Sequence, residues 1–354
     1  MKSGKISENV LKRSVLKQLQ ADQGKDIISG AAVGADCAIF KCSGTAGENL
    51  ISSVNSAAGA NVSDAAAAME IAACVQESAV EGDLDVRRLI HRTVNSLACA
   101  GASPVAALIS ILYPESGEEE TLRRLMAEIQ NVCAGLSVAI VGGQTNVSAD
   151  ISTAHISVTG IGSEWQEALL KPGAARPGQD IVVSKWIGLE GTAVLAARGA
   201  QHLVSRYPRR LIEEAVSFER YLSVLPEAKA ALRMGASALH DASEGGIFRA
   251  LWELAESAGT GLRVELKKLP IRQETVEVCE FYRINPYELL SGGSLLMAIE
   301  DGNALVQALK REGIPAGVVG KITGDHDRVI TNEDEIRFLE RPGTDEIYKY
   351  MAQT

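Results

Sequence analysis

The chain has 354 residues, of which 46% are hydrophobic and 4% aromatic, and 33 are glycine. This length predicts two domains, and the composition favours an Ala/Gly-rich α/β or α+β protein over an all-β sandwich. The formal net charge of −10 argues against a nucleic-acid partner, because nonspecific binding to a phosphate backbone relies on clustered Lys and Arg.

The N-terminal stretch MKSGKISENVLKRSVLKQLQ places apolar residues at helical spacing and has no uninterrupted apolar run, so we expect a folded helix there and no signal peptide. The longest apolar run, VAALISILY at 105–113, is about half as long as a membrane-spanning helix. We therefore expect a cytoplasmic protein with no membrane partner. Six cysteines without C-x-x-C spacing predict buried free thiols.

Helical and strand periodicities alternate through the rest of the chain. The first half predicts a helix over 86–100, a strand over 105–112, a helix over 119–136, and strands in SVAIVGG and ISTAHISVTGIG. The Pro/Gly-rich stretch KPGAARPGQD then predicts a boundary between a domain over 1–170 and a domain over 171–354. The second half predicts a strand in IVVSKW, helices from GLEGTAVLAARG to about 235, and closing strands in VVGKIT and RVITNEDEIRFL.

Five glycine-flanked polar clusters lie where one element gives way to the next, which is where binding residues commonly project. No P-loop, G-x-G-x-x-G, H-E-x-x-H or G-x-S-x-G pattern accompanies them. The clusters are AVGADCAIF (32–40), TVNSLACAGASP (93–104), VGGQTNVS (141–148), GLEGTAVLA (188–196) and HDASEGGIF (240–248).

The cluster HDASEGG has two interpretations. Asp241 and Glu244 have the spacing of a capping box at the start of an amphipathic helix. Capping does not explain Gly245 and Gly246, since glycine inside a helix costs roughly 1 kcal/mol relative to alanine. Close backbone approach to an anion at the helix start would explain them, with His240 beside it.

Read in chain order, these clusters resemble the superfamily of AIR synthase (PurM), selenophosphate synthetase, thiamine-monophosphate kinase and the hydrogenase-maturation carbamoyl dehydratase. VGADCAIF is similar to its acidic G-x-D-x-A loop, TVNSLACAGASP to its N-D-x-x-x-x-G-A-x-P helix, and VGGQTNVS to its GG-x-T strand end. KPGAARPGQDIVVSKWIGLEGTAVLA, HDASEGGIFRALWELAESAG and INPYELLSGGSLLMAIE are similar to its second domain. The likeness spans nearly the whole chain and is strongest to the hydrogenase-maturation carbamoyl dehydratase and its relatives, the AIR-synthase-related proteins.

The resemblance implies an α+β, two-domain PurM-like fold. The N-terminal domain would hold a four-stranded sheet with helices that forms a barrel with a second subunit, giving a homodimer, and the C-terminal domain would be an α/β sandwich. It also implies ATP, Mg²⁺ and phosphorylation of an amide or carboxamide oxygen on a small-molecule or peptide substrate. The implied residues are Asp36 for metal and nucleotide, Asn95, Gly142, Gly143, Thr145, Gly245 and Gly246 for the nucleotide, and His240 and Asp241 for catalysis, with Gly188, Glu190 and Gly191 as further candidates.

Three positions depart from the family pattern. Ser96 replaces the aspartate of N-D, Asn55 stands where a D-P pair is expected, and Gln144 follows the GG pair, so the site has fewer carboxylates for Mg²⁺. The maturation enzyme presents a C-terminal cysteine, whereas this sequence ends KYMAQT, so we do not expect the cyanide-forming route. Two hypotheses result: an ATP-dependent enzyme acting on a carboxamide or amide-type substrate, or a non-catalytic dimeric protein that binds a ligand or partner.

Overall fold

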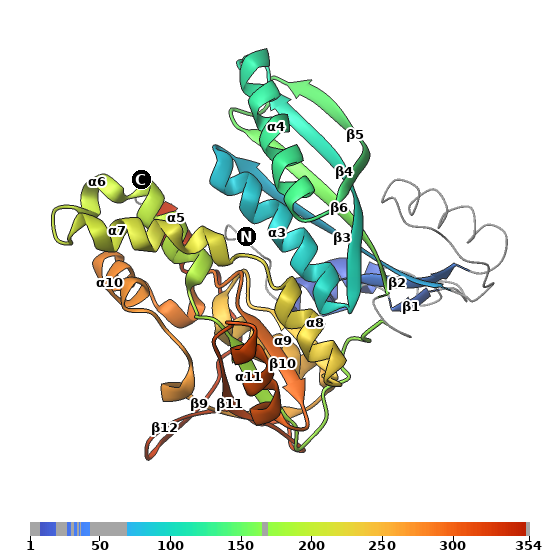
Figure 1. Ribbon diagram of the computed structural model, residues 1–354, viewed down its shortest axis with the longest axis vertical. Helices are drawn as coiled ribbons and strands as arrows, with labels where there is room; N and C mark the ends of the chain where they lie inside the picture. Colours follow the sequence, from blue (N-terminus) through green and yellow to red (C-terminus); the bar gives the residue numbers. More distant parts are fainter. Residues whose placement is uncertain are drawn as a thin grey trace. The chain divides into compact units, whose positions relative to one another are not determined.

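The computed structural model describes residues 8–18, 27–29, 32–33, 35, 37–42, 69–164 and 169–351 (Figure 1). These residues form two compact units. The N-terminal unit contains 27–29, 37–42, 69–164 and 169, and the C-terminal unit contains 8–18, 32–33, 35 and 170–351. None of the helices among these residues is both long enough and apolar enough to cross a membrane.

The N-terminal unit is built on a six-stranded sheet with the order β1-β2-β3-β6-β4-β5. Its four long strands correspond to the predicted four-stranded sheet, and β1 and β2 extend it at one edge. All neighbouring strands are antiparallel except β4 and β5. The strands are β1 Ile27–Ser29, β2 Ala38–Cys42, β3 Met69–Val80, β4 Ala102–Pro114, β5 Ala139–Ser148 and β6 Ala154–Glu164.

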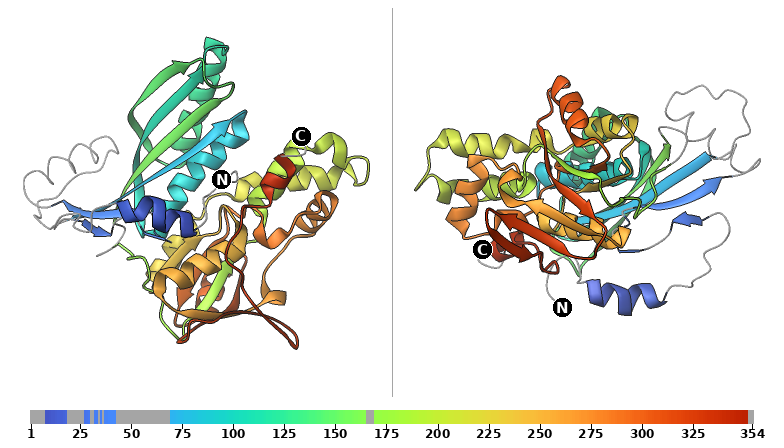
Figure 2. Two further views of the ribbon diagram at one scale, coloured as in Figure 1. Left: turned by 180° about the vertical axis from the view of Figure 1, so that it is seen from behind. Right: turned by 90° about the horizontal axis from the view of Figure 1, so that it is seen from below.

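Helices α3 (Asp83–Cys99) and α4 (Glu119–Gly135) cover one face of this sheet (Figure 1). Both begin with acidic residues, which the helix dipole favours at that end. Along β4, Ile109 and Ile111 are buried while Leu108 and Leu112 are exposed, as alternation on a one-sided sheet requires. The opposite face of the sheet, visible from behind in Figure 2, is therefore uncovered within the described residues.

The C-terminal unit is built on a seven-stranded sheet with the order β13-β12-β9-β11-β7-β10-β8. Neighbours are antiparallel except β12 and β9. The predicted closing strands are confirmed as β11 and the β12–β13 hairpin. The strands are β7 Asp180–Ser184, β8 Ala238–Asp241, β9 Gly261–Glu265, β10 Leu295–Ile299, β11 Ala316–Thr323, β12 Arg328–Asn332 and β13 Glu335–Phe338.

Helices cover both faces of the centre of this sheet, so all five residues of β7 are buried. Ile181 and Val183 share a core with the apolar stripe of α9, whereas α8 and α11 contact the sheet at β10 and β7. The helices are α5 Leu189–Arg198, α6 Ala200–Leu203, α7 Arg209–Val216, α8 Leu225–Arg233, α9 Gly246–Ala258, α10 Gln273–Tyr282, α11 Gly302–Arg311 and α12 Ile347–Met351, with 3-10 turns η3 Ser217–Tyr221, η4 Leu266–Lys268 and η5 Pro286–Glu288.

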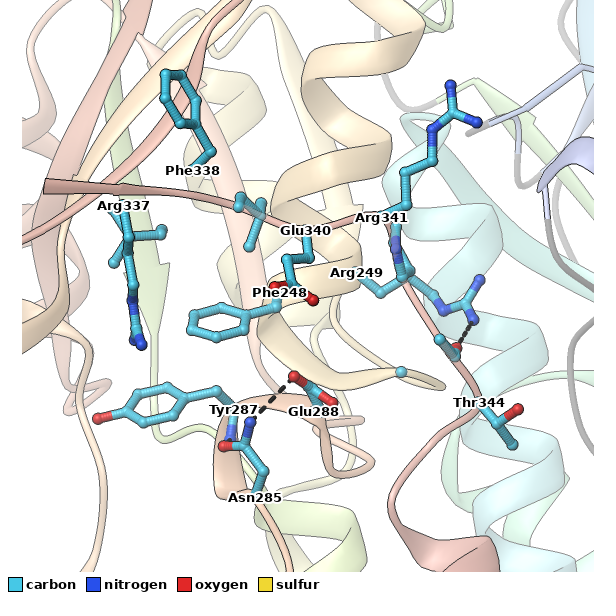
Figure 3. A pocket seen from close by; sticks show the side chains of 15 residues that line it. Phe248, Arg249, Asn285, Tyr287, Glu288, Arg337, Phe338, Glu340, Arg341 and Thr344 are labelled. Carbon is cyan, nitrogen blue, oxygen red and sulfur yellow. Dashed lines mark hydrogen bonds between the residues drawn. The ribbon is translucent and has the colours of Figure 1, made fainter.

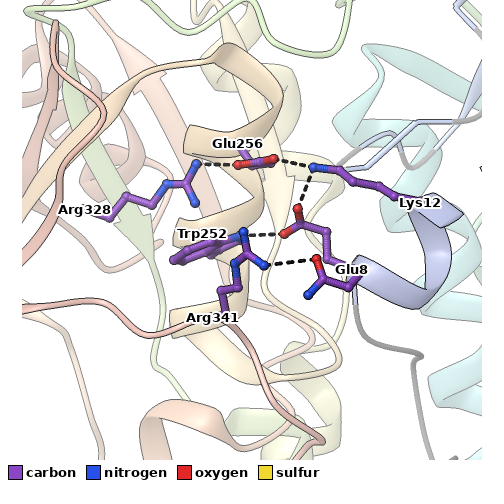
Figure 4. A network of polar contacts seen from close by, with 7 residues as sticks. Glu8, Lys12, Trp252, Glu256, Arg328 and Arg341 are labelled. Carbon is purple, nitrogen blue, oxygen red and sulfur yellow. Dashed lines mark hydrogen bonds and ion pairs between the residues drawn. The ribbon is translucent and has the colours of Figure 1, made fainter.

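The predicted N-terminal helix is present as a short irregular helix, α1 (Glu8–Val10) continued by η1 (Leu11–Val15) and η2 (Leu16–Gln18). It is held on α9 by polar contacts (Figure 4). The Trp252 indole donates to Glu8, and Lys12 lies 2.7 Å from Glu256. Arg328 also binds Glu256, at 2.6 Å, and its guanidinium lies 3.9 Å from the centre of the Trp252 ring. Hydrogen bonds from Lys12 and Arg328 lower the pKa of Glu256 to about 2.

Candidate functional site

Three loops of the C-terminal unit meet at one edge of its sheet. Strand β10 is antiparallel to both β7 and β8, so the ends of β7 and β8 lie beside the start of β10. The loops that leave these strands are tied together by hydrogen bonds. The amide of Gly188 donates to Ser291 Oγ at 2.7 Å, the amide of Ser291 to the carbonyl of Ala242 at 3.0 Å, and the amide of Ala242 to the carbonyl of Ser294 at 3.1 Å. The GLEG and HDASEGG clusters are thus neighbours.

The glutamate of the GLEG cluster, Glu190, is fully buried and lies against Gly292 of the SGG loop, residues 291–293. A Cβ added at Gly292 would be 2.3 Å from Glu190 Oε2, and one added at Gly191 would overlap the Leu289 side chain. The absence of a side chain at Gly191 and Gly292 therefore lets the two loops pack closely against each other.

His240 and Asp241 end strand β8 and are 5% and 6% exposed. The Nδ1 atom of His240 is 3.0 Å from the carbonyl oxygen of Asp241, and its Nε2 atom is 3.4 Å from Glu253 Oε2. Arg249 Nη1 lies 3.5 Å from the other oxygen of Glu253. No motif in the sequence indicated Arg249 and Glu253, although two opposite charges four residues apart beside the apolar stripe of α9 are a visible signal. The catalytic roles of His240 and Asp241 stay predictions.

The predicted capping box is wrong. Asp241 belongs to β8, and α9 begins only at Gly246, with Gly245 as its N-cap in the left-handed region at φ 87°. Because the N-cap residue is a glycine, it has no side chain that could bond the first turn of the helix. Four residues of turn separate Asp241 from the helix, so neither Asp241 nor Glu244 stands at a capping-box position.

The two glycines of HDASEGG have a structural explanation inside the protein. Gly246 has φ 66°, and an added Cβ would lie 2.6 Å from the carbonyl oxygen of Tyr287 and 2.7 Å from that of Leu289. The close approach predicted for a ligand is therefore made here by the protein's own backbone. Ligand binding by Gly245 and Gly246 stays a prediction.

The group bound at the start of α9 is a carboxyl of the same chain, that of Asp345. The amide of Gly245 donates to Asp345 Oδ2, while Asp345 Oδ1 accepts from the amides of Ile347 at 2.8 Å and Leu290 at 3.4 Å. Asp345 is 2% exposed. Burial, with smaller effects of the Glu244 and Glu190 charges, raises the pKa of Asp345 to about 7 against the lowering effect of its N–H donors. No sequence motif indicated this residue.

At the end of β7, Lys185 is 6% exposed and has φ 53°. Its ammonium lies 2.6 Å from Glu227 Oε1 and donates to the carbonyl of Tyr221 at 2.9 Å. Burial lowers the pKa of Lys185, while the charges of Glu227 and Asp241 oppose that shift. Lys185 therefore places a buried positive charge within electrostatic range of Asp241.

A cavity of about 500 Å³ opens beside the start of α9 (Figure 3). Phe248 and Tyr287 form one wall as parallel rings with centres 5.1 Å apart. Residues 337–344 form the opposite wall, which is anchored because Arg249 Nη2 donates to the carbonyl of Gly343. Glu288 also lines the cavity, and burial raises its pKa. The cavity combines an aromatic surface with charged groups, as small-molecule sites do.

Asn95 of the N-terminal unit is 1% exposed within α3. Its neighbour Ser96 is 4% exposed and accepts a hydrogen bond from Gln76 Nε2 at 3.2 Å. The hydroxyl of Ser96, which stands where the family has the aspartate of its N-D pair, is thus hydrogen-bonded inside the N-terminal unit. The structure does not test the predicted nucleotide contact of Asn95.

Gly142, Gly143 and Thr145 were predicted at a strand end, but they lie within the exposed edge strand β5. Gly143 has φ 152°, and an added Cβ would be 1.8 Å from the carbonyl oxygen of Ile109, so the β4–β5 pairing itself requires glycine. Gln144 donates to Asn146 at 3.3 Å. Nucleotide binding by Gly142, Gly143 and Thr145 stays a prediction.

Asp36 and Asn55 lie outside the described residues. In the described part of the chain, no three His, Cys, Asp or Glu side chains are grouped as metal ligands. The Mg²⁺ prediction therefore depends on Asp36 and stays a prediction.

Comparison with known proteins identifies the family. The sequence profile of the AIR synthase related protein N-terminal domain matches residues 34–163, and that of the C-terminal domain matches residues 176–332. A carbamoyl dehydratase HypE of Rhodobacter capsulatus is 31% identical over 240 residues, covering 66% of this chain and 68% of the relative. The chain belongs to the AIR synthase related family.

Other members of the AIR synthase related family agree with this assignment. A putative hydrogenase expression/formation protein of Methanocaldococcus jannaschii is 29% identical over 261 residues, covering 70% of this chain and 72% of the relative. The crystal structure of E. coli HypE, a hydrogenase maturation protein, superposes with a TM-score of 0.67 at 21% identity, covering 85% of this chain and 99% of that one. The α+β, two-domain PurM-like fold is confirmed.

Proposed function

We propose that this protein is an ATP-dependent enzyme that phosphorylates a carboxamide or amide-type group during maturation of a metalloenzyme such as a hydrogenase. Supporting the proposal, the Rhodobacter capsulatus relative is named a carbamoyl dehydratase, and a structure of hydrogenase maturation protein HypE in complex with ATP has the same fold, with a TM-score of 0.66 at 20% identity over 86% of this chain and 97% of that one.

The observation that carries this proposal is the assembly of the HDASEGG loop with the GLEG and SGG loops at one sheet edge. Phosphoryl transfer depends mainly on positioning and on neutralising charge. His240 and Lys185 are buried basic groups beside Asp241, and they suit this task. Asp36 would hold Mg²⁺, a hard cation that prefers carboxylate oxygens and neutralises phosphate charge.

A second candidate function is a non-catalytic dimeric protein that binds a ligand or partner. Ser96 and Gln144 favour it because neither supplies a carboxylate, and both hydroxyl and amide are engaged within the N-terminal unit. A relative of the same fold is known in a HypE–HypF complex. Partner binding is thus the alternative if the nucleotide site has lost its affinity.

Calorimetric titration with ATP separates the two functions. We expect wild-type protein to bind ATP at millimolar concentration or below, more tightly with Mg²⁺ than without. Asp36→Ala should abolish the Mg²⁺ dependence, whereas Asp150→Ala, the same change in an exposed turn of the N-terminal unit, should not. Absence of binding by the wild type would end the enzyme proposal.

We also propose a homodimer formed through the uncovered face of the N-terminal sheet. Val75 and Leu108 both lie beside Thr159 on this face and are 63% and 39% exposed. An apolar surface of this kind is typical of an interface. Light scattering at micromolar concentration should give twice the 37.5 kDa chain mass for the wild type. Val75→Asp with Leu108→Asp should give a monomer, and Val204→Asp on the C-terminal unit should not.

A further inference from the structure

Each ring nitrogen of His240 lies near an oxygen atom: Nδ1 is within hydrogen-bond distance of a carbonyl, and Nε2 is at ion-pair distance from a carboxylate. A carbonyl oxygen, that of Asp241, lies 3.0 Å from Nδ1, and a carbonyl can only accept, so Nδ1 carries a proton. A carboxylate oxygen, Glu253 Oε2, lies 3.4 Å from Nε2. An ionised carboxylate also only accepts, so this environment favours a second proton on the ring.

A guanidinium beside a carboxylate favours its charged form, and Arg249 lies beside Glu253. Its Nη1 atom lies 3.5 Å from Glu253 Oε1, on the oxygen that does not face His240. The side chains of Arg249, Glu253 and His240 are all less than 10% exposed, so their charges are poorly screened by water. One carboxylate therefore bridges a guanidinium and an imidazole.

Four elements supply the charges around His240. Strand β8 supplies Asp241, helix α9 supplies Arg249 and Glu253, Lys185 follows the end of β7, and Glu227 of helix α8 pairs with Lys185. Two basic groups, Lys185 and Arg249, thus stand beside three carboxylates. The imidazole is the remaining group, and contact with Glu253 decides its charge.

We propose that Glu253 is a positioning residue that holds His240 as a buried imidazolium. This inference rests on the proposed function, in which His240 faces the phosphate or the substrate. A cationic ring there attracts a phosphate and can donate a proton, whereas a neutral ring does neither as well. Helix α9 thereby serves the site twice: its first residue packs against the backbone of residues 287–289, and Glu253, about two turns further on, orients the histidine.

Nuclear magnetic resonance of the histidine ring nitrogens tests the proposal directly. The chain has five histidines, and loss of one set of signals in His240→Gln identifies His240. In wild-type protein we expect His240 to remain protonated at pH 7 and to release its proton only above that. In Glu253→Gln its titration midpoint should fall by about one pH unit or more, because the opposite charge is gone. Glu253→Asp should restore part of that shift.

Glu256→Gln is the matched control, since it is the same change one turn further along α9, where the carboxylate binds Lys12 and Arg328. It should leave the His240 midpoint unchanged. A neutral His240 in wild-type protein at pH 7, or an unchanged midpoint in folded Glu253→Gln, would overturn the proposal. If Glu253→Gln does not fold, the wild-type spectrum alone decides.

Titration with ATP in parallel separates this inference from the proposed function. An imidazolium that depends on Glu253 in a protein without ATP affinity would leave the charge assignment standing and remove the enzymatic proposal. ATP binding by a protein whose His240 is neutral would leave the enzymatic proposal standing and remove the charge assignment. If both hold, Glu253→Gln should also shift the pH profile of turnover to lower pH by the amount seen in the spectra.

Discussion

Replacing Asp345 by asparagine tests whether this carboxyl is the protein's own ligand at the start of α9. Burial raises the pKa of Asp345 from its ordinary value of 3.8 to about 7, so the folded protein binds a proton there that the unfolded chain releases at lower pH. The side chain of asparagine has nearly the same shape as the protonated carboxyl, and its amide does not titrate. Its NH2 group cannot accept the hydrogen bond that a carboxyl oxygen accepts there, but this loss is the same at every pH. The pH dependence of the difference in stability therefore isolates the cost of ionising Asp345 in the folded state.

The expected effect depends on pH with a definite sign. Because the pKa of Asp345 is raised in the folded protein, its contribution to stability is full when the pH is below the ordinary pKa of 3.8. This contribution is lost as the pH rises through about 7. A shift of about three units corresponds to about 4 kcal/mol, at 1.36 kcal/mol per unit. The free energy of unfolding of the wild type, minus that of Asp345→Asn, should therefore fall by up to about 4 kcal/mol between about pH 4 and pH 8.

Urea unfolding followed by tryptophan fluorescence measures this difference. Trp186 and Trp252 both lie in the C-terminal unit and report on it. Measurements at several pH values should show the variant gaining on the wild type above pH 5. A difference that stays flat from pH 5 to pH 8 would show instead that Asp345 titrates as an exposed carboxyl.

Further substitutions test the packing around the site. Gly246→Ala should destabilise the protein by about 3 kcal/mol in urea unfolding, since the left-handed backbone and the contact with residues 287–289 both oppose a Cβ. Gly259→Ala, also left-handed but with no atom near the added carbon, should cost only about 1 kcal/mol; equal losses would contradict the close approach. Lys185→Met should cost about 3 to 5 kcal/mol by leaving the buried Glu227 unpaired. Adding Glu227→Leu should recover part of that loss, and no recovery would argue against the ion pair.

Local patterns in the sequence were enough to locate most elements. The helix predicted over 119–136 is α4, and the alternating stretch ISTAHISVTGIG is β6. These predictions succeeded because the period of apolar residues depends only on which face of a helix or strand is buried. The pattern could not show that β4 and β5 are parallel or that two short strands join the sheet, because pairing depends on residues far apart in the chain.

In the candidate site, too, local patterns could be predicted and contacts between distant residues could not. The sequence indicated HDASEGG and GLEG as separate clusters, and the sheet order β7-β10-β8 brings them together through Ser291. The spacing of Asp241 and Glu244 matched a capping box, but spacing alone cannot tell whether a residue ends a strand or precedes a helix. Here Asp241 completes pairing with Leu295, which removes it from the helix start.

The family, the two-domain α+β fold and the position of the HDASEGG loop could be predicted from the sequence, because the order of short motifs along a chain is preserved whatever their contacts. The group bound at the start of α9 could not, because it comes from a distant part of the chain. Asp345 lies 100 residues after Gly245, and a contact over that distance leaves no local pattern. The same holds for His240, whose environment is set by Glu253 and Arg249 from a helix that packs on its strand.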